Sequence, residues 1–129
     1  MKGIPVLLSP GELLDKITIL RIKSERMQDA SKLNNVRQEL ALLERTWEQA
    51  VPASATLAQE SVALQRVNTE LWDIEDRIRE LEARQCFDAE FIELARAVYR
   101  RNDERAAIKK RINLQLNSSL VEEKSYRPY

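Results

Sequence analysis

The chain has 129 residues, the size of one domain, and its basic residues (Lys plus Arg) and acidic residues (Asp plus Glu) both number 21. A formal charge of zero argues against a nucleic-acid partner, because a nucleic-acid-binding surface usually carries a basic excess. There is no His and only one Cys, Cys86, so the usual zinc ligand sets are lacking and no disulfide can close within the chain. We therefore predict a single domain, residues 1–129, without metal or cofactor.

No segment approaches the ~20 apolar residues that a membrane-spanning helix needs. The apolar run of residues 4–8 is too short for a signal peptide, so we expect a cytoplasmic protein without a membrane span. Two Gly, four Pro and 33% charged residues are typical of long helices. The composition therefore predicts an all-α protein.

The first half of the chain predicts an extended arm and two helices. Pro5 keeps residues 1–8 out of a helix. A helix over residues 10–28 follows, because Ser9 can cap it, Pro10 suits its first position and Glu12 completes a capping box. A second helix is expected over residues 32–50. Its apolar positions recur in steps of three and four residues: Leu33, Val36, Leu40, Leu43 and Trp47.

The second half predicts two longer helices, over residues 56–84 and 88–117, followed by a tail at 118–129. Asp88 is a plausible N-cap of the last helix. Helices of this length span about 45 Å, more than one small globule covers. The fold class that we predict is an all-α antiparallel bundle of four helices. Its last two helices form a long hairpin, whose tip either projects or is covered by a second subunit. Of these two arrangements we expect the homodimer.

Three polar residues interrupt the apolar stripe of the last helix. Asn102, Arg105 and Lys109 occupy consecutive positions of that stripe, and Arg101 flanks them. A buried Arg or Lys needs a carboxylate or an anionic ligand opposite. The sequence does not say which. The apolar members of the stripe, expected in the core, are Phe91, Ala95, Val98, Ile112 and Leu116.

A second polar stripe lies on the helix over residues 56–84. It consists of Asn68, Trp72, Glu75 and Arg79, with Asp76 beside it. These side chains suit a ligand site, but Trp72 could also cover the edge of the core while Glu75 and Arg79 form a surface ion pair. A hairpin that folds back near residue 86 would bring Asn68 and Trp72 opposite the polar stripe of the last helix, at Asn102 and Arg105.

Several motifs resemble a small uncharacterised family of bacterial helical proteins, a domain of unknown function of about this length. They are SPGELLDKITIL (residues 9–20), NVRQELALL (35–43), ELWDIEDRIRELEA (70–83), ELARAVYRRNDERAAIKKRIN (93–113) and VEEKSY (121–126). A looser similarity joins residues 68–79 and 101–105 to another helical family of unknown function, whose members tend to be encoded beside genes of surface-glycan synthesis. This resemblance implies a role near polysaccharide synthesis.

Three functions remain open at this point. The first is a binding or accessory protein for an anionic sugar, a sugar nucleotide or a glycan-synthesis enzyme. Arg105 and Lys109 would then hold the anion, Asn68 and Glu75 would bind hydroxyl groups, and Trp72 would stack on the sugar. The second is a small all-α enzyme in the manner of chorismate mutases, which work without His or metal. The third is a scaffold whose internal charges fix the register of a dimer.

Overall fold

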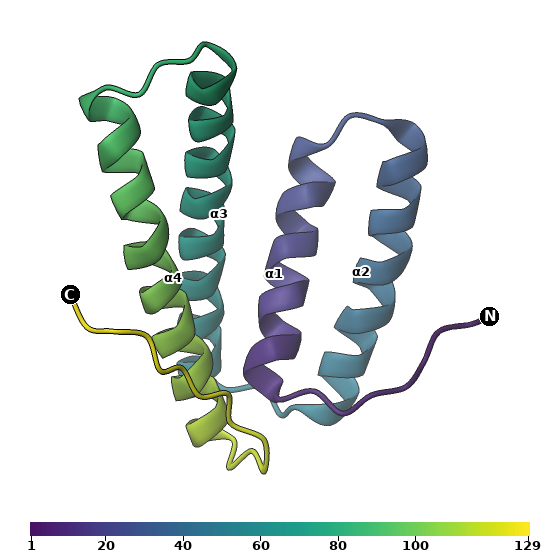
Figure 1. The fold of residues 1–129 in the computed structure, drawn as a ribbon. Helices are drawn as coiled ribbons and strands as arrows, with labels where there is room; N and C mark the ends of the chain where they lie inside the picture. The colour runs from purple at the N-terminus through teal and green to yellow at the C-terminus, as the bar shows by residue number, and fades with distance from the viewer.

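Four α-helices and no strand make up the fold of the computed structural model, which describes residues 1–129 (Figure 1). The helices are α1 (Pro10–Arg26), α2 (Ala30–Ala50), α3 (Ala55–Ala83) and α4 (Ala89–Gln115). Every boundary falls within two residues of the predicted one. The all-α bundle predicted from periodicity and capping residues is thereby confirmed.

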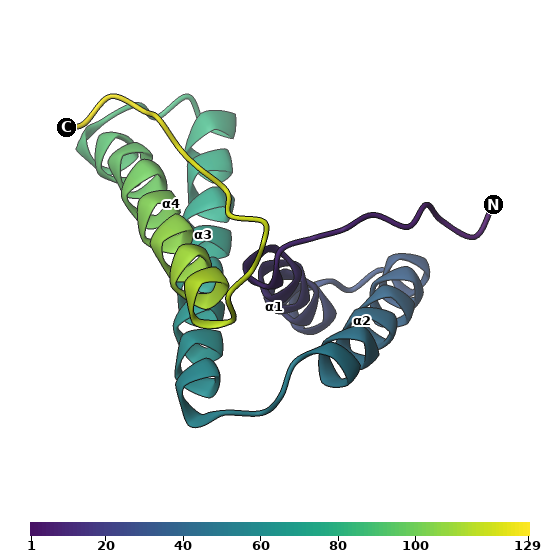
Figure 2. The ribbon, with the colours of Figure 1, turned by 90° about the horizontal axis from the view of Figure 1, so that it is seen from below.

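Helix α1 is the central element. It contacts α2 on one side and both α3 and α4 on the other, whereas α2 packs along α1 (Figures 1 and 2). The sequence explains this position, because α1 carries apolar residues around most of its circumference. The main core cluster lies where α1 meets the hairpin, and its members are Leu14, Leu57, Leu64, Val67, Ile108 and Ile112.

Side-chain caps fix the starts of three helices. Ser9 accepts a hydrogen bond from the Glu12 amide at 3.2 Å, Asp29 caps α2 and Ser54 caps α3 in the same way. Asp88 is the N-cap residue of α4, but its side chain makes no capping hydrogen bond. The expected capping box is incomplete, because the Glu12 carboxylate accepts a hydrogen bond from Lys109 on α4.

Helices α3 and α4 form the predicted antiparallel hairpin, and its tip extends beyond the ends of α1 and α2 (Figure 1). The expectation of a continuous apolar core stripe along α4 fails towards this tip, since Ala95 is exposed and Phe91 is only half-buried. The reason is that α1 ends at Arg26, so no helix covers this part of α4. Four ion pairs across the hairpin agree with a register that folds back near residue 86: Arg77–Glu90, Glu70–Arg101, Arg66–Glu104 and Glu60–Arg111.

The two chain ends differ in their contacts. Residues 1–8 are extended, as expected, but every side chain in this arm is exposed. The tail after α4 turns back and runs alongside that helix (Figures 1 and 2). Two ion pairs tie it there, Lys109–Glu122 and Lys110–Glu123. None of the four helices has the length and apolar character of a membrane span.

Candidate functional site

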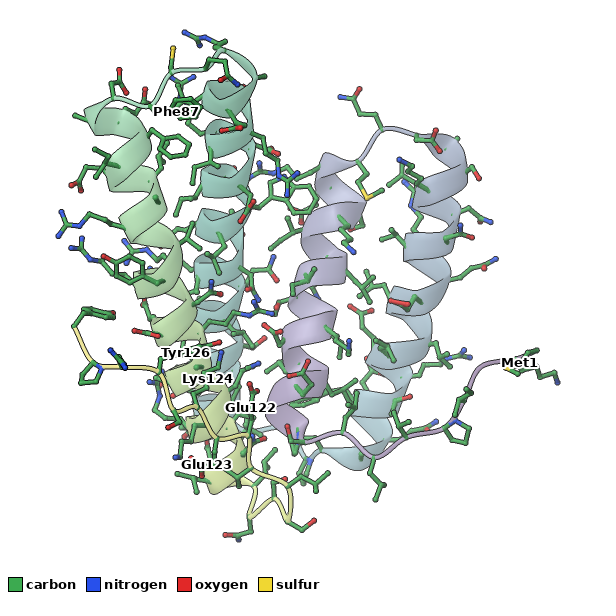
Figure 3. The ribbon with its side chains drawn as sticks, viewed as in Figure 1. Met1, Phe87, Glu122, Glu123, Lys124 and Tyr126 are labelled. Atoms are coloured by element: carbon green, nitrogen blue, oxygen red, sulfur yellow. The ribbon has the colours of Figure 1, made fainter.

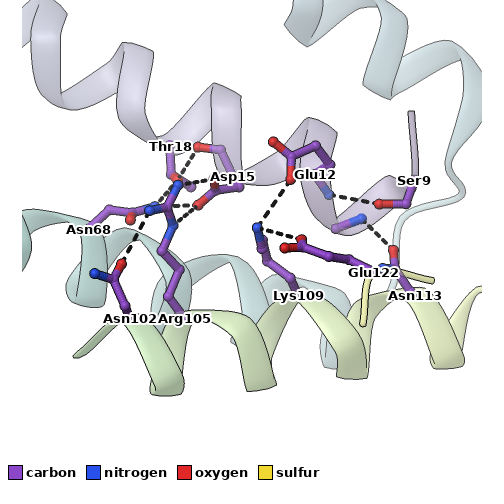
Figure 4. Close-up of polar contacts among 11 residues, drawn as sticks. Ser9, Glu12, Asp15, Thr18, Asn68, Asn102, Arg105, Lys109, Asn113 and Glu122 are labelled. Carbon is purple, nitrogen blue, oxygen red and sulfur yellow. Dashed lines mark hydrogen bonds and ion pairs between the residues drawn. The ribbon is translucent and has the colours of Figure 1, made fainter. Parts of the chain in front are cut away.

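A buried carboxylate on α1 forms an ion pair with Arg105 on α4. Asp15 is 1% exposed, and both of its oxygens accept hydrogen bonds from Arg105, one of them from Nε at 2.9 Å (Figure 4). The amide nitrogen of Asn68 donates to Asp15 Oδ1 and to Thr18 Oγ1, each at 2.9 Å. One network therefore joins three helices through groups of complementary hydrogen-bonding character.

The network keeps Asp15 ionised. Burial alone raises the pKa of this carboxyl, but hydrogen bonds from Arg105 and Asn68, together with the charge of Arg105, lower it further than burial raises it. The net result is a pKa below the ordinary value. Asp15 thus stays charged at neutral pH and neutralises the guanidinium that it contacts.

Lys109 belongs to a separate cluster one turn further along α4. Its ammonium group lies 3.1 Å from a carboxylate oxygen of Glu12 and 3.1 Å from one of Glu122 in the tail (Figure 4). Burial lowers the pKa of Lys109, but these two hydrogen bonds raise it more, so the net pKa lies above the ordinary value. Two carboxylates therefore surround the cation and leave little charge for an anionic ligand.

Close packing holds the start of α1 against α4. The Gly11 amide donates to Asn113 Oδ1 at 2.7 Å, which satisfies one of the free N–H groups at this helix end. A Cβ atom at Gly11 would lie 2.5 Å from the Lys109 carbonyl oxygen. Glycine is thus required by the closeness of the two backbones, and this contact sets how near Asp15 comes to Arg105.

A hollow of about 380 Å³ opens beside the Asp15 network, between α1 and α3. We call it the helix hollow. Trp72, Leu71 and Ile19 supply its apolar lining, and Asn68 and Arg105 come from the network. Its remaining lining residues are Glu75, Asp76 and Arg79.

The helix hollow brings together six of the nine predicted site residues: Asn68, Trp72, Glu75, Asp76, Arg79 and Arg105. The other three lie elsewhere. Arg101 pairs with Glu70 on the hairpin, and Lys109 is held in its own cluster. Asn102 lines a different hollow under the tail, although its Oδ1 accepts a long hydrogen bond of 3.5 Å from Arg105.

Sequence reasoning left the role of Asp15 open and missed its neighbour Thr18, the Lys109 partners Glu12 and Glu122, and Asn113. A signal existed for Asp15, because it is an acidic residue between Leu14 and Ile17 in a helix whose apolar residues are spread around most of its circumference. Lys16, the next residue of α1, is exposed and takes no part in the network. Thr18 lies within α1, as Asp15 does. Glu12 and Asn113 lie near helix ends and Glu122 lies in the tail, where spacing does not indicate a partner.

These features define an all-α protein with an internal ionic network and a polar hollow beside it. The chain belongs to a family of unknown function, DUF6165, whose family model matches residues 4–128. No curated protein and no solved structure matches the chain.

Proposed function

We propose that the chain is a binding protein whose helix hollow accepts a neutral, hydroxyl-rich ligand such as a sugar. The observation that carries this proposal is the position of the Trp72 ring beside hydrogen-bonding groups of Asn68 and Arg105 that the protein leaves unused. An aromatic face beside a few directed polar groups is the usual composition of a small-molecule site.

The unused groups follow from the network. Both amide protons of Asn68 are donated to α1, and its Oδ1 accepts no hydrogen bond from the chain. Arg105 directs Nε and Nη2 at Asp15, while Nη1 makes only the long contact to Asn102. Asp76 forms no ion pair with any residue. A hydroxyl group, which both donates and accepts, suits such a mixture of donors and acceptors.

The charge of the helix hollow favours a neutral ligand over an anionic one. Its lining holds two guanidinium groups and two carboxylates, and Asp15 behind it adds a third negative charge. Arg79 pairs with Glu75 at 3.4 Å, and Arg105 is neutralised by Asp15. An added phosphate or carboxylate would therefore meet no free cation. The volume lies at the lower end of ordinary ligand pockets, about 300–1,000 Å³.

Tryptophan fluorescence tests this proposal directly. In a Trp47→Phe protein, Trp72 is the sole indole, so its emission reports on the helix hollow. Titration with methyl glucoside, methyl galactoside, methyl mannoside and N-acetylglucosamine should give a saturable change with at least one of them. Glucose 1-phosphate, which adds an anionic group, should bind no better than the neutral sugars.

The matched variants are Asp76→Asn and Asp73→Asn, two carboxylates on α3 of which only Asp76 lines the hollow. The first should weaken sugar binding and the second should not. No saturable change with any of the four sugars would reject the proposal. A preference for glucose 1-phosphate would restore the anionic sugar expected from the sequence. A sugar ligand would also agree with the link to polysaccharide synthesis that the looser family resemblance implies.

We also propose that the chain forms a homodimer, as its long helices suggest. Its accessible surface is 9123 Å², whereas a compact monomer of 15.0 kDa exposes roughly 7,000 Å². The excess exceeds the roughly 800 Å² that each partner buries in a standard interface. Large apolar side chains are exposed along the arm and the hairpin: Met1, Ile4, Val6, Leu7, Val62, Phe87, Ile92 and Tyr99.

Light scattering during gel filtration tests the dimer. The wild type should elute at twice the chain mass, and Ile4→Ser with Leu7→Ser should weaken association if the arm takes part. A monomeric wild type at high micromolar concentration would reject the dimer and would leave the ligand proposal standing.

A further inference from the structure

A second and larger hollow lies between α4 and the C-terminal tail. Its volume is about 760 Å³, within the range of ordinary ligand sites. We call it the tail hollow. Figure 3 shows the tail with Lys124 and Tyr126 passing alongside α4. The lining residues are Val98, Tyr99, Asn102 and Asp103 from α4, and Lys124, Tyr126, Arg127, Pro128 and Tyr129 from the tail.

The tail hollow holds cations that no carboxylate neutralises. Lys124 and Arg127 form no ion pair. In the three other main hollows every lining cation is paired, namely Arg21 with Glu44, Arg66 with Glu70 and Glu104, Arg79 with Glu75, and Arg105 with Asp15. Of these four hollows, the tail hollow is therefore the one that offers unpaired positive charge to an anion.

The acidic side chain of the tail hollow is already engaged. Asp103 accepts a hydrogen bond of 2.6 Å from the Tyr129 hydroxyl, and this bond raises the pKa of Tyr129. The lining side chains then carry two positive charges against one negative charge. The lining of the helix hollow holds two cations and two carboxylates, so the two hollows differ in the ligand that they favour.

Aromatic rings line the same hollow and leave surface free. Tyr99 and Tyr129 meet edge to face with centroids 5.0 Å apart. Tyr126 is 80% exposed, and the Lys124 ammonium group lies 5.6 Å from the centre of its ring. An exposed ring flanked by a cation is a suitable stacking surface for a nucleobase that carries a phosphate.

Asn102 adds a polar group to the lining of the tail hollow. Its Oδ1 faces Arg105, and its amide nitrogen donates to no group in the chain. An amide can pair with the edge of a nucleobase, which presents acceptors. We propose that the tail hollow binds a nucleoside phosphate, with the base on the tyrosine rings and the phosphate on Lys124 and Arg127. The site does not depend on a sugar in the helix hollow.

Calorimetric titration of the full chain with AMP, UMP, adenosine, uridine and inorganic phosphate tests the proposal. AMP or UMP should bind at least about tenfold more tightly than its nucleoside or phosphate alone, a difference of about 1.4 kcal/mol. The nucleotide affinity should fall with added salt, because the phosphate contact is ionic and exposed. Absence of binding by both nucleotides, or equal affinity for inorganic phosphate, would overturn the proposal.

A charge-matched pair of double variants locates the site. Lys124→Ala with Arg127→Ala removes the free cations of the tail hollow. Lys32→Ala with Arg37→Ala removes two exposed, unpaired cations of α2. The first should lose at least about tenfold in nucleotide affinity, and the second should bind as the wild type does. Equal losses would show non-specific attraction and reject the site.

Tyr126→Ala separates recognition of the base from recognition of the phosphate. It should weaken AMP or UMP binding while inorganic phosphate binds as before. Trp72→Ala should leave nucleotide binding unchanged, because Trp72 lies in the helix hollow. If Trp72→Ala abolished nucleotide binding and the Lys124 and Arg127 variant retained it, the ligand would occupy the other hollow and the proposal would be wrong.

Discussion

Asp15 of α1 and Arg105 of α4 lie 90 positions apart in the sequence and form a two-point ion pair in which the carboxylate is fully buried. The guanidinium is only partly covered, with 28% of its side chain exposed on the side of the helix hollow. The ion pair therefore has two structural roles. It joins the helix pair α1–α2 to the hairpin, and it fixes the edge of Arg105 that faces the proposed ligand.

Asp15→Asn should destabilise the protein by about 3 kcal/mol, at the lower end of the cost of breaking a buried pair. The substitution keeps the size of the side chain but removes the charge that compensates Arg105. The loss stays at the lower end because Arg105 can reach water at its exposed edge. Urea denaturation at neutral pH measures the change in the free energy of unfolding.

The control is Asp73→Asn, which breaks the exposed ion pair Arg26–Asp73. It should change the free energy of unfolding little, because exposed pairs contribute little. Replacing Asp15 and Arg105 together with Leu and Met should recover part of the loss, since no buried charge is then left alone. Equal losses in Asp15→Asn and Asp73→Asn would contradict a buried pair.

The stability difference between the wild type and Asp15→Asn should shrink in acid. The folded-state pKa of Asp15 lies below its unfolded value of about 3.9, so its contribution is present above that value. It is lost as the pH falls through the folded-state pKa. Urea denaturation of both proteins between pH 7 and pH 2.5 tests this, because all other carboxylates are common to both. A difference that stays constant down to pH 2.5 would show that Asp15 does not titrate with a lowered pKa.

The helices and their hairpin register could be predicted because the signals are local. Ser9, Asp88 and a turn near residue 86 mark helix ends within a few residues of sequence, and apolar spacing marks the helices between them. The burial of Ala95 was predicted wrongly, because it depends on where α1 stops. The end of α1 belongs to a different part of the chain, and the pattern of α4 carries no information about it.

The candidate site, too, could be predicted from the sequence only where the signal was local. Arg105 was recognisable as a cation inside an apolar stripe, and a carboxylate opposite it was one of two expectations. The identity of that carboxylate could not be predicted, because α1 is apolar on most faces and its pattern does not say which face meets the hairpin. The contact of Glu122 was still harder to predict, since a tail has no periodicity from which its path could be inferred.

Gly11→Ala should destabilise the protein by about 1–3 kcal/mol, although alanine is the better helix former. The new methyl group would lie 2.5 Å from the Lys109 carbonyl oxygen, so α1 must move away from α4. Thermal and urea denaturation measure the loss. Asn113→Ala should not rescue the variant, because the closest atom belongs to the backbone. A Gly11→Ala protein as stable as the wild type would show that the two helices are not in such close contact.

Glu122→Gln should release the tail without unfolding the bundle. Glu122 is tied to the nearly buried Lys109, which keeps Glu12 as a second partner when the charge of Glu122 is removed. Limited trypsin digestion, followed by mass spectrometry, should show faster cleavage after Lys124 while the urea midpoint changes little. Glu123→Gln is the matched control, because its partner Lys110 is exposed and holds the tail only weakly. Equal cleavage rates in the two variants would show that the Lys109 pair does not anchor the tail, and the tail hollow would then lack a fixed wall.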